Sequence, residues 1–295
     1  MKIIMYHYVR NSNKQFSFFH FVSRKKFISQ ILKYKKKIIK NEDEINETSK
    51  KILLTFDDGF KDHFFVAKEL KKKNLIGLFF IPSLPYINKK ILNVHLVHLI
   101  IGKMGGKIAY DELIKFLKIH KLKNFIRLED EKKFNSRYKN QIDNDYSKKF
   151  KKMINYQSNE VHIKKVLKFL LKKFKIKHKF SDIYLTINQV KQMRKMGMII
   201  GSHSNSHRVL SRLNYKDQLS EIQESKKFIE KIIKEKCNHF CFPYGRKNSY
   251  NKYTLNILKK LKFKYAYSVE SRNASKIDFS KKNFELPRFD CNEFI

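Results

Sequence analysis

The sequence predicts an α/β fold in which parallel strands are joined by helical crossovers. Short apolar, β-prone runs alternate with amphipathic segments whose apolar residues recur at spacings of three and four. One stretch interrupts this alternation: residues 86–180 are rich in lysine, have a helical pattern and contain no convincing strand. We therefore expect one domain over residues 1–295, with a lysine-rich helical insertion at 86–180.

Seven short segments are candidate strands, and the segments between them have a helical period. The residues Phe27, Ile28, Ile31 and Leu32 show this period after the first strand. A chain that alternates in this way favours parallel strands, because a parallel pair needs a crossover connection. The candidate strands are Ile3–Tyr6, Lys51–Phe56, Ile76–Ile81, Met198–Ser202, His239–Phe242, Tyr265–Val269 and Phe284–Leu286.

The composition indicates a globular and strongly basic protein. The 42% hydrophobic and 14% aromatic shares exclude a disordered chain. The formal net charge of +39 attracts polyanions of any kind, including nucleic acid, anionic lipid headgroups and phosphate-bearing glycan carriers. The excess is mostly lysine and accompanies many Ile, Asn, Phe and Tyr residues but no Trp, which an AT-rich coding bias would also produce. Both explanations of the charge stay open here.

The cysteines and the N-terminus bear on location. Cys237, Cys241 and Cys291 form no CxxC pair and no even disulfide framework, which indicates a reducing compartment. Cys237 and Cys241 have a spacing that could ligate a metal, although buried thiols are more common. We find neither a secretory leader nor a run of about 18 apolar residues. We therefore expect a cytoplasmic protein without a membrane span, in peripheral contact at most with the inner membrane face.

Polar side chains follow several candidate strands at the point where each strand ends. Because the carboxyl ends of parallel strands meet on one face, where ligands bind, we expect these side chains to lie together. In chain order they are His7, Asp57, Asp58, His203, His207 and Tyr244.

The adjacent carboxylates of Asp57 and Asp58 are the first chemical signal. Two like charges at the tip of a buried strand repel each other and lose hydration, and a bound cation relieves both costs. Adjacent residues of an extended segment point in opposite directions, so one carboxylate can bind metal while the other faces the substrate. Gly59 then permits a sharp turn. The alternative is that Asp57 or Asp58 caps a helix beginning near Phe60, which is the more common role of Asp-Asp-Gly taken alone.

The pair His203 and His207 is the second signal. Two histidines four residues apart stand on one side of a helical turn, so both imidazoles can reach one ion. Two imidazoles and one carboxylate leave positions open for water and substrate, as in catalytic rather than structural metal sites. In isolation the spacing is a weak signal, but each motif here follows its own apolar strand.

These segments resemble the polysaccharide deacetylases of the NodB-homology class, also called carbohydrate esterase family four. The resemblance implies a distorted (β/α)7 barrel with the helical insertion within it. It departs from the family at Leu78, where a threonine is common. The matching segments are Leu54–Phe60, Gly77–Ile81, Thr186–Met198, Ile200–His207 and Phe240–Gly245.

The resemblance implies a role for each matching residue. Asp58, His203 and His207 would ligate a divalent metal, usually zinc, with cobalt, nickel or manganese as alternatives. Asp57 would be the general base, and the backbone at Tyr244 would line the oxyanion site. This agrees with the chemistry expected of the residues themselves, since a metal polarises an acyl carbonyl and a flanking carboxylate takes a proton from water.

The general acid and the partner of Asp57 depart from the family pattern. The chain has no Leu-x-His motif near its C-terminus, but Met5–Val9 is similar to the N-terminal motif of a permuted branch that includes poly-N-acetylglucosamine deacetylases. His7 would then protonate the leaving amine, unless it is merely a strand-end histidine, in which case His239, His95 and His98 are the next candidates. Cys241 stands where an arginine is common. Arg288 could orient Asp57 instead, or be exposed.

The function that this reading favours is metal-dependent hydrolysis of N-acetyl or related acyl groups on a sugar of a surface-glycan precursor or polysaccharide. The expected substrate is an acylated amino sugar, which could be lipid- or nucleotide-linked. The alternatives are O-deacylation or deformylation at the same metal centre, and a degenerate deacetylase scaffold that binds polyanions. Retention of every ligand and the base argues against the scaffold, so we do not expect a nucleic-acid partner.

Overall fold

The computed structural model describes residues 1–12, 14–122, 143–157 and 160–294, which fall into two compact units. The first unit comprises Met1–Asn11, Phe21–Lys90 and Phe180–Ile295, and the second comprises Ser12–His20 and Ile91–Lys179. Both predicted carboxylates and both predicted histidines of the metal site belong to the first unit.

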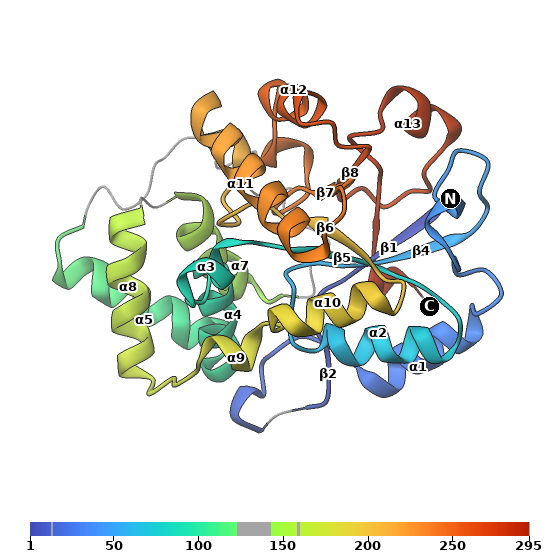
Figure 1. The fold of residues 1–295 in the computed structure, drawn as a ribbon. Helices are drawn as coiled ribbons and strands as arrows, with labels where there is room; N and C mark the ends of the chain where they lie inside the picture. The colour runs from blue at the N-terminus through green and yellow to red at the C-terminus, as the bar shows by residue number, and fades with distance from the viewer. Residues whose placement is uncertain (13, 123–142, 158–159, 295) are drawn as a thin grey trace. The chain divides into compact units, whose positions relative to one another are not determined.

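A curled parallel sheet of seven strands forms the centre of the first unit, as the sequence predicts (Figure 1). The strand order is β8-β7-β6-β5-β4-β1-β9, and every neighbouring pair is parallel. The short strands β2 (Val9–Arg10) and β3 (Val22–Ser23) form a separate parallel pair. The strands of the main sheet are β1 (Lys2–Tyr6), β4 (Ile52–Phe56), β5 (Leu78–Ile81), β6 (Ile199–Ser202), β7 (His239–Cys241), β8 (Tyr265–Tyr267) and β9 (Phe289–Asp290).

Most helices of the first unit follow a strand, and they bury apolar residues against the rest of the unit. All five residues of β4 are buried, as expected of a strand covered on both faces. Helix α2 packs on α10, α10 on α11, and α11 on α12. The helices of this unit are α1 (Arg24–Lys33), α2 (His63–Lys72), α3 (Leu84–Asn88), α9 (Phe180–Ile183), α10 (Ile187–Lys195), α11 (Tyr215–Ile233), α12 (Lys252–Lys260) and α13 (Lys276–Lys281).

The last segment of the chain contacts both edges of the sheet. Leu286 forms an isolated parallel bridge with Tyr267 of β8, at one edge. Three residues later Phe289 pairs with Ile4 of β1, at the other edge. The prediction of a strand at Phe284–Leu286 is therefore wrong. Leu286 makes a single bridge, and the strand forms after the proline at position 287, which has no N–H to continue a ladder.

The second unit is helical in the part of it that the structure describes. No strand occurs among the described residues of 86–180, and the predictions that fall on 123–142 and 158–159 lie outside them. The grouping of the whole chain into one domain with an insertion stays a prediction. The elements of this unit are α4 (Asn93–Met104), α5 (Gly106–Ile119), α7 (Asp145–Lys152), α8 (Glu160–Lys173) and the single π-helical turn Met153–Gln157.

The fold confirms the predicted class, a distorted (β/α) barrel of seven parallel strands. Within the described residues, we find no helix that combines the length and the apolar character needed to cross a membrane.

Candidate metal centre and active site

The carboxyl ends of β4 and β6 carry the residues that the sequence singles out. Asp57 and Asp58 follow β4 directly, and His203 follows β6. Asp58 has a φ of 79° and Gly59 one of 63°, so the chain turns sharply here through left-handed backbone. Helix α2 begins only at His63, which excludes the alternative in which Asp57 or Asp58 caps a helix starting at Phe60.

The side chains of Asp58, His203 and His207 converge at one point. His203 Nε2 lies 3.4 Å from Asp58 Oδ1, and His207 Nε2 lies 3.3 Å from the same oxygen. All three side chains are buried. Ligand atoms at the usual zinc distances in a tetrahedral site are themselves about 3.3 Å apart, so the two distances to Asp58 Oδ1 fit a divalent metal.

The two histidines reach the same point by a different backbone path from the one predicted. Residues 203–207 form no helical turn, and both Ser204 and His207 have a φ of 59°. Left-handed backbone at a residue other than glycine costs about 1–3 kcal/mol, so the surrounding structure must hold this turn in place. The prediction of a helical turn is therefore wrong, although the two imidazole rings are brought to within 4.8 Å of each other between centroids.

Asp57 forms a bidentate ion pair with Arg288. Arg288 Nη1 donates to Asp57 Oδ1 and Nη2 donates to Oδ2, both at 2.8 Å. Arg288 is fully buried, and its Nη1 also donates to Thr55 Oγ1. Burial alone would raise the pKa of Asp57. The charge and hydrogen bonds of Arg288 outweigh burial and hold that pKa below its ordinary value, so the carboxylate stays ionised.

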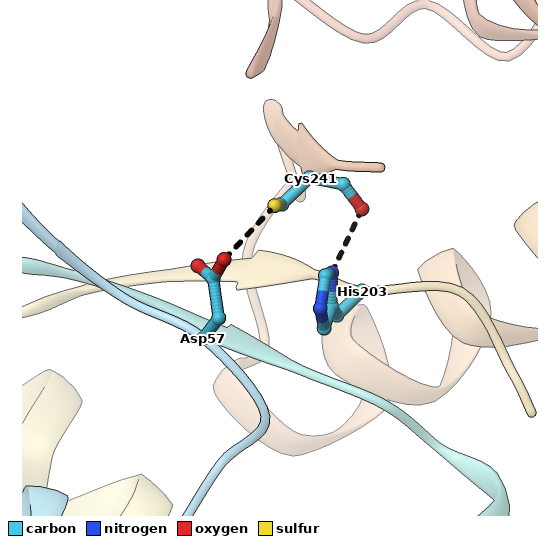
Figure 2. Close-up of side chains that lie close together, drawn as sticks. All are labelled: Asp57, His203 and Cys241. Atoms are coloured by element: carbon cyan, nitrogen blue, oxygen red, sulfur yellow. Dashed lines mark hydrogen bonds between the residues drawn. The ribbon is translucent and has the colours of Figure 1, made fainter. Parts of the chain in front are cut away.

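Cys241 lies between this ion pair and His203 (Figure 2). Its thiol donates to Asp57 Oδ2 at 3.5 Å and accepts from Arg288 Nη2 at 3.0 Å, while its carbonyl accepts from His203 Nδ1 at 2.8 Å. The carbonyl bond fixes which nitrogen of His203 faces Asp58. Asp57, His203 and Cys241 could also approach a metal as a set. The guanidinium of Arg288 against both Asp57 and Cys241 disfavours a cation there.

His7 lies at the edge of the same site. Its Nε2 is 4.0 Å from Asp58 Oδ2, and 39% of its side chain is exposed, so a substrate could contact it. The main chain at His7 is fixed by a hydrogen bond, because the buried His63 donates from Nε2 to the carbonyl oxygen of His7 at 2.7 Å. The predicted role of His7 as the proton donor stays a prediction.

Tyr244 joins the site through its ring and its unusual backbone. The ring packs edge-on against His207 at 4.9 Å between centroids, and the residue has a φ of 64°. The predicted role of its main chain in an oxyanion site stays a prediction.

The three other candidates for the general acid belong to other elements of the structure. His239 opens β7 and bonds to Tyr267 and Glu42, so it lies at the opposite end of the strand from Cys241. His95 and His98 belong to α4 of the second unit.

Three residues that position the site were missed in the sequence. Thr55 is in the motif but was given no role, although it bonds to Arg288. His63 and Glu221 are buried on helices whose other inward positions are mostly apolar. A titratable residue on the apolar face of a predicted helix is the signal that could have identified both.

A parallel barrel with a buried set of carboxylate and imidazole groups at the carboxyl ends of its strands is the arrangement expected of an α/β enzyme, because ligands bind at that end of the strands. Residues 146–266 match the family model for polysaccharide deacetylase, so this part of the chain resembles that family. The match covers both histidines and Cys241–Tyr244.

Individual proteins are also similar to this chain. A Bacillus subtilis (strain 168) protein provisionally named polysaccharide deacetylase YxkH is 31% identical over 93 residues, which is 32% of each chain. The alignment thus spans about a third of that curated relative. The deacetylase PplD of Streptococcus pyogenes, solved with acetate, aligns with a TM-score of 0.59 at 17% identity over 98% of this chain and 91% of that one. A de-N-acetylase from Aggregatibacter actinomycetemcomitans aligns with a TM-score of 0.53 at 12% identity, over 100% of this chain and 99% of that one. These two structural likenesses show the fold.

Proposed function

We propose that this protein is a divalent-metal-dependent deacetylase that hydrolyses the N-acetyl group of an amino sugar. The observation that carries the proposal is the convergence of Asp58, His203 and His207, with donor atoms 3.3 and 3.4 Å apart, beside an ionised Asp57. The family supports carbohydrate deacetylation. Zinc is the proposed ion, since two imidazoles and one carboxylate are donors that it accepts readily, with cobalt, nickel or manganese as alternatives.

The residues divide the chemistry among themselves. A divalent ion held by Asp58 and the two histidines would polarise the acyl carbonyl and make water more acidic. Asp57 is oriented by Arg288 and takes the proton of the attacking water. His7 is exposed at the edge of the site and gives a proton to the departing sugar amine. The backbone at Tyr244 faces the negative charge that develops on the carbonyl oxygen.

The substrate class follows from the charge as well as from the site. We propose a sugar of a surface-glycan precursor or polysaccharide, since a net charge of +39 favours approach to a phosphate-bearing carrier, either lipid-linked or nucleotide-linked. The same field is compatible with contact at an anionic membrane surface and with action before export, on the cytoplasmic side.

The test is removal and return of the metal. Chelation should abolish release of acetate from N-acetylglucosamine oligosaccharides, and added zinc or cobalt should restore it. His203→Ala should lose metal stoichiometry, because loss of one of three protein ligands weakens a site sharply. A His203→Ala protein that retains metal as tightly as the unmodified protein would contradict the assignment. Activity only on O-acetyl or N-formyl substrates would show a different acyl specificity at the same centre.

A further inference from the structure

The turn that carries His207 is held by a buried carboxylate on the neighbouring helix. Glu221 of α11 accepts hydrogen bonds from the backbone N–H groups of Asn205 at 3.1 Å and Ser206 at 2.8 Å, both at Oε2. The hydroxyl of Ser206 donates to its other oxygen, Oε1. Consecutive backbone N–H groups that converge in this way form an anion-binding concavity, and here Glu221 fills it.

This support matters because the turn is conformationally unfavourable by itself. Ser204 and His207 both adopt left-handed backbone, and the His207 N–H donates to Ser204 Oγ at 3.1 Å across the turn. Two such residues in four cost several kcal/mol unless external contacts compensate. Glu221 supplies such contacts, and it is only 7% exposed, so water competes weakly for the same donors.

The other side of the turn is held by different groups. The N–H of Leu84 donates to the carbonyl of Asn205 at 2.9 Å, and the N–H of Ser83 donates to the carbonyl of Ser204 at 3.3 Å. The start of α3 therefore holds the acceptors of the turn, while α11 holds its donors. Without Glu221, the carbonyl groups of Ser204 and Asn205 would keep their hydrogen bonds, but the backbone N–H groups of Asn205 and Ser206 would lose theirs. The backbone of the turn would then be free to rotate toward a more favourable φ.

We propose that Glu221 is a positioning residue that holds the turn 204–207 so that His207 reaches the point shared with Asp58 and His203. The inference rests on the proposed metal centre and adds a residue that does not contact the metal. Its consequence is that the arrangement of the metal donors depends on α11, a helix of 19 residues with a largely buried face.

Glu224 offers a matched control on the same helix, one turn further along. Its carboxylate accepts from the side-chain Nδ2 of Asn205 at 3.0 Å and from Ser220 Oγ at 2.6 Å, but it is exposed and contacts no backbone N–H of the turn. A Glu224 substitution removes one negative charge from the same helix but leaves the hydrogen bonds to the backbone N–H groups of the turn in place.

The experiment is a titration of metal-free protein with Co²⁺, followed by its visible absorption and by competition with a chelator. Glu221→Ala should bind Co²⁺ about 10–100-fold more weakly, the usual effect of losing a residue that orients a ligand. Glu221→Gln keeps an acceptor oxygen for the two N–H groups and should recover most of that loss. Glu224→Ala should stay within about twofold of the unmodified protein, since exposed contacts contribute little.

If Glu221→Ala does not fold, Ser206→Ala gives a second measurement, because it removes one hydrogen bond from a partly exposed residue. We expect it to weaken Co²⁺ binding about 2–10-fold. Unchanged Co²⁺ affinity in folded Glu221→Ala, or in Ser206→Ala where the first is unfolded, would overturn the role of Glu221 and leave the metal centre intact. An unmodified protein that binds no Co²⁺ would overturn the proposed function and this inference together.

Discussion

Arg288 and Asp57 form a fully buried ion pair, with two parallel hydrogen bonds of 2.8 Å, between positions 231 residues apart in the chain. The segment that bridges the two edges of the sheet places Arg288 inside the barrel. Arg288 thus supplies the positive charge beside Asp57 and Cys241. The orientation of the proposed base thus depends on closure of the barrel by the last residues of the chain.

Arg288→Met should destabilise the protein by about 3–5 kcal/mol, because it leaves a buried carboxylate without its partner. Urea unfolding measures this change. Arg194→Met is the control, since Arg194 pairs with Glu235 at a partly exposed site and should cost no more than about 1 kcal/mol. The double variant Asp57→Asn/Arg288→Met should recover part of the loss. Equal destabilisation by the Arg288 and Arg194 variants would contradict a strong buried pair.

The pH dependence of turnover should change in the same variant. Arg288 lowers the pKa of Asp57 against the effect of burial, so its removal should raise that pKa. The acidic limb of the pH–rate profile should then move to higher pH, because the base must be deprotonated to act. An acidic limb that stays in place would show that Asp57 is not the group that limits the rate there.

Asp57→Asn and Asp58→Asn should separate the base from the ligand. Asp57→Asn should retain metal but lose about 10²–10⁴-fold in turnover, because an amide cannot take the proton of water. Asp58→Asn should instead lose metal, since Asp58 Oδ1 is the oxygen nearest to both imidazoles. Metal analysis of the purified variants distinguishes them. Equal metal loss in both variants would contradict the assignment of Asp57 as the base and Asp58 as the ligand.

The site could be predicted from the sequence largely because its residues follow strands. Apolar runs identify the strands, and the carboxyl ends of parallel strands lie at the same edge of the sheet. Asp58 and His203 are therefore expected to lie close together without any knowledge of the loop conformations. Backbone alternation predicted only that one of the two adjacent carboxylates would bind metal and the other face the substrate, and the resemblance assigned these roles to Asp58 and Asp57. The expected closeness of the residues needs only local structure and the direction of the strands.

The rest depended on tertiary contacts. The turn at His207 was predicted as helical because spacing alone cannot distinguish a helical turn from left-handed backbone held by Glu221. The last strand was placed too early because Phe284 and Leu286 are apolar and alternate with a polar residue, whereas the actual pairing with β1 follows from barrel closure. The orientation of Arg288 toward Asp57 was one of two alternatives, since nothing local to Leu-Pro-Arg indicates which partner it meets.

His63 should make stability depend on pH in the weakly acidic range. Burial lowers its pKa from 6.5 to about 4, so between these values the unfolded chain binds a proton that the folded protein does not. Above pH 6.5 the free energy of unfolding is not reduced by protonation of His63. As the pH falls from 6.5 toward 4, the free energy of unfolding decreases by about 3 kcal/mol, because only the unfolded chain binds the proton.

Urea unfolding of the unmodified protein and of His63→Gln at several pH values isolates this contribution. Glutamine can still donate to the carbonyl of His7 but does not titrate. The difference in unfolding free energy between the two proteins should shift by about 3 kcal/mol between pH 7 and pH 4 in favour of the variant. A difference that is constant with pH would show that His63 does not titrate as its burial requires.

The last prediction concerns His7, whose proposed role as the general acid follows from its exposed position 4.0 Å from Asp58. If His7 gives a proton to the departing amine, His7→Ala should slow amide hydrolysis by about 10²–10⁴-fold. It should hardly affect hydrolysis of an activated aryl acetate, because a phenolate departs without protonation. Metal content should stay normal, since His7 is not a ligand in this arrangement. The main chain at position 7 is held by His63 through the carbonyl of His7 and not through its imidazole, so the substitution should leave the strand end in place.

A variant equally impaired on both substrates would indicate that His7 acts on the metal site or the fold, and the proton donor would then have to be a group outside this chain's strand-end residues.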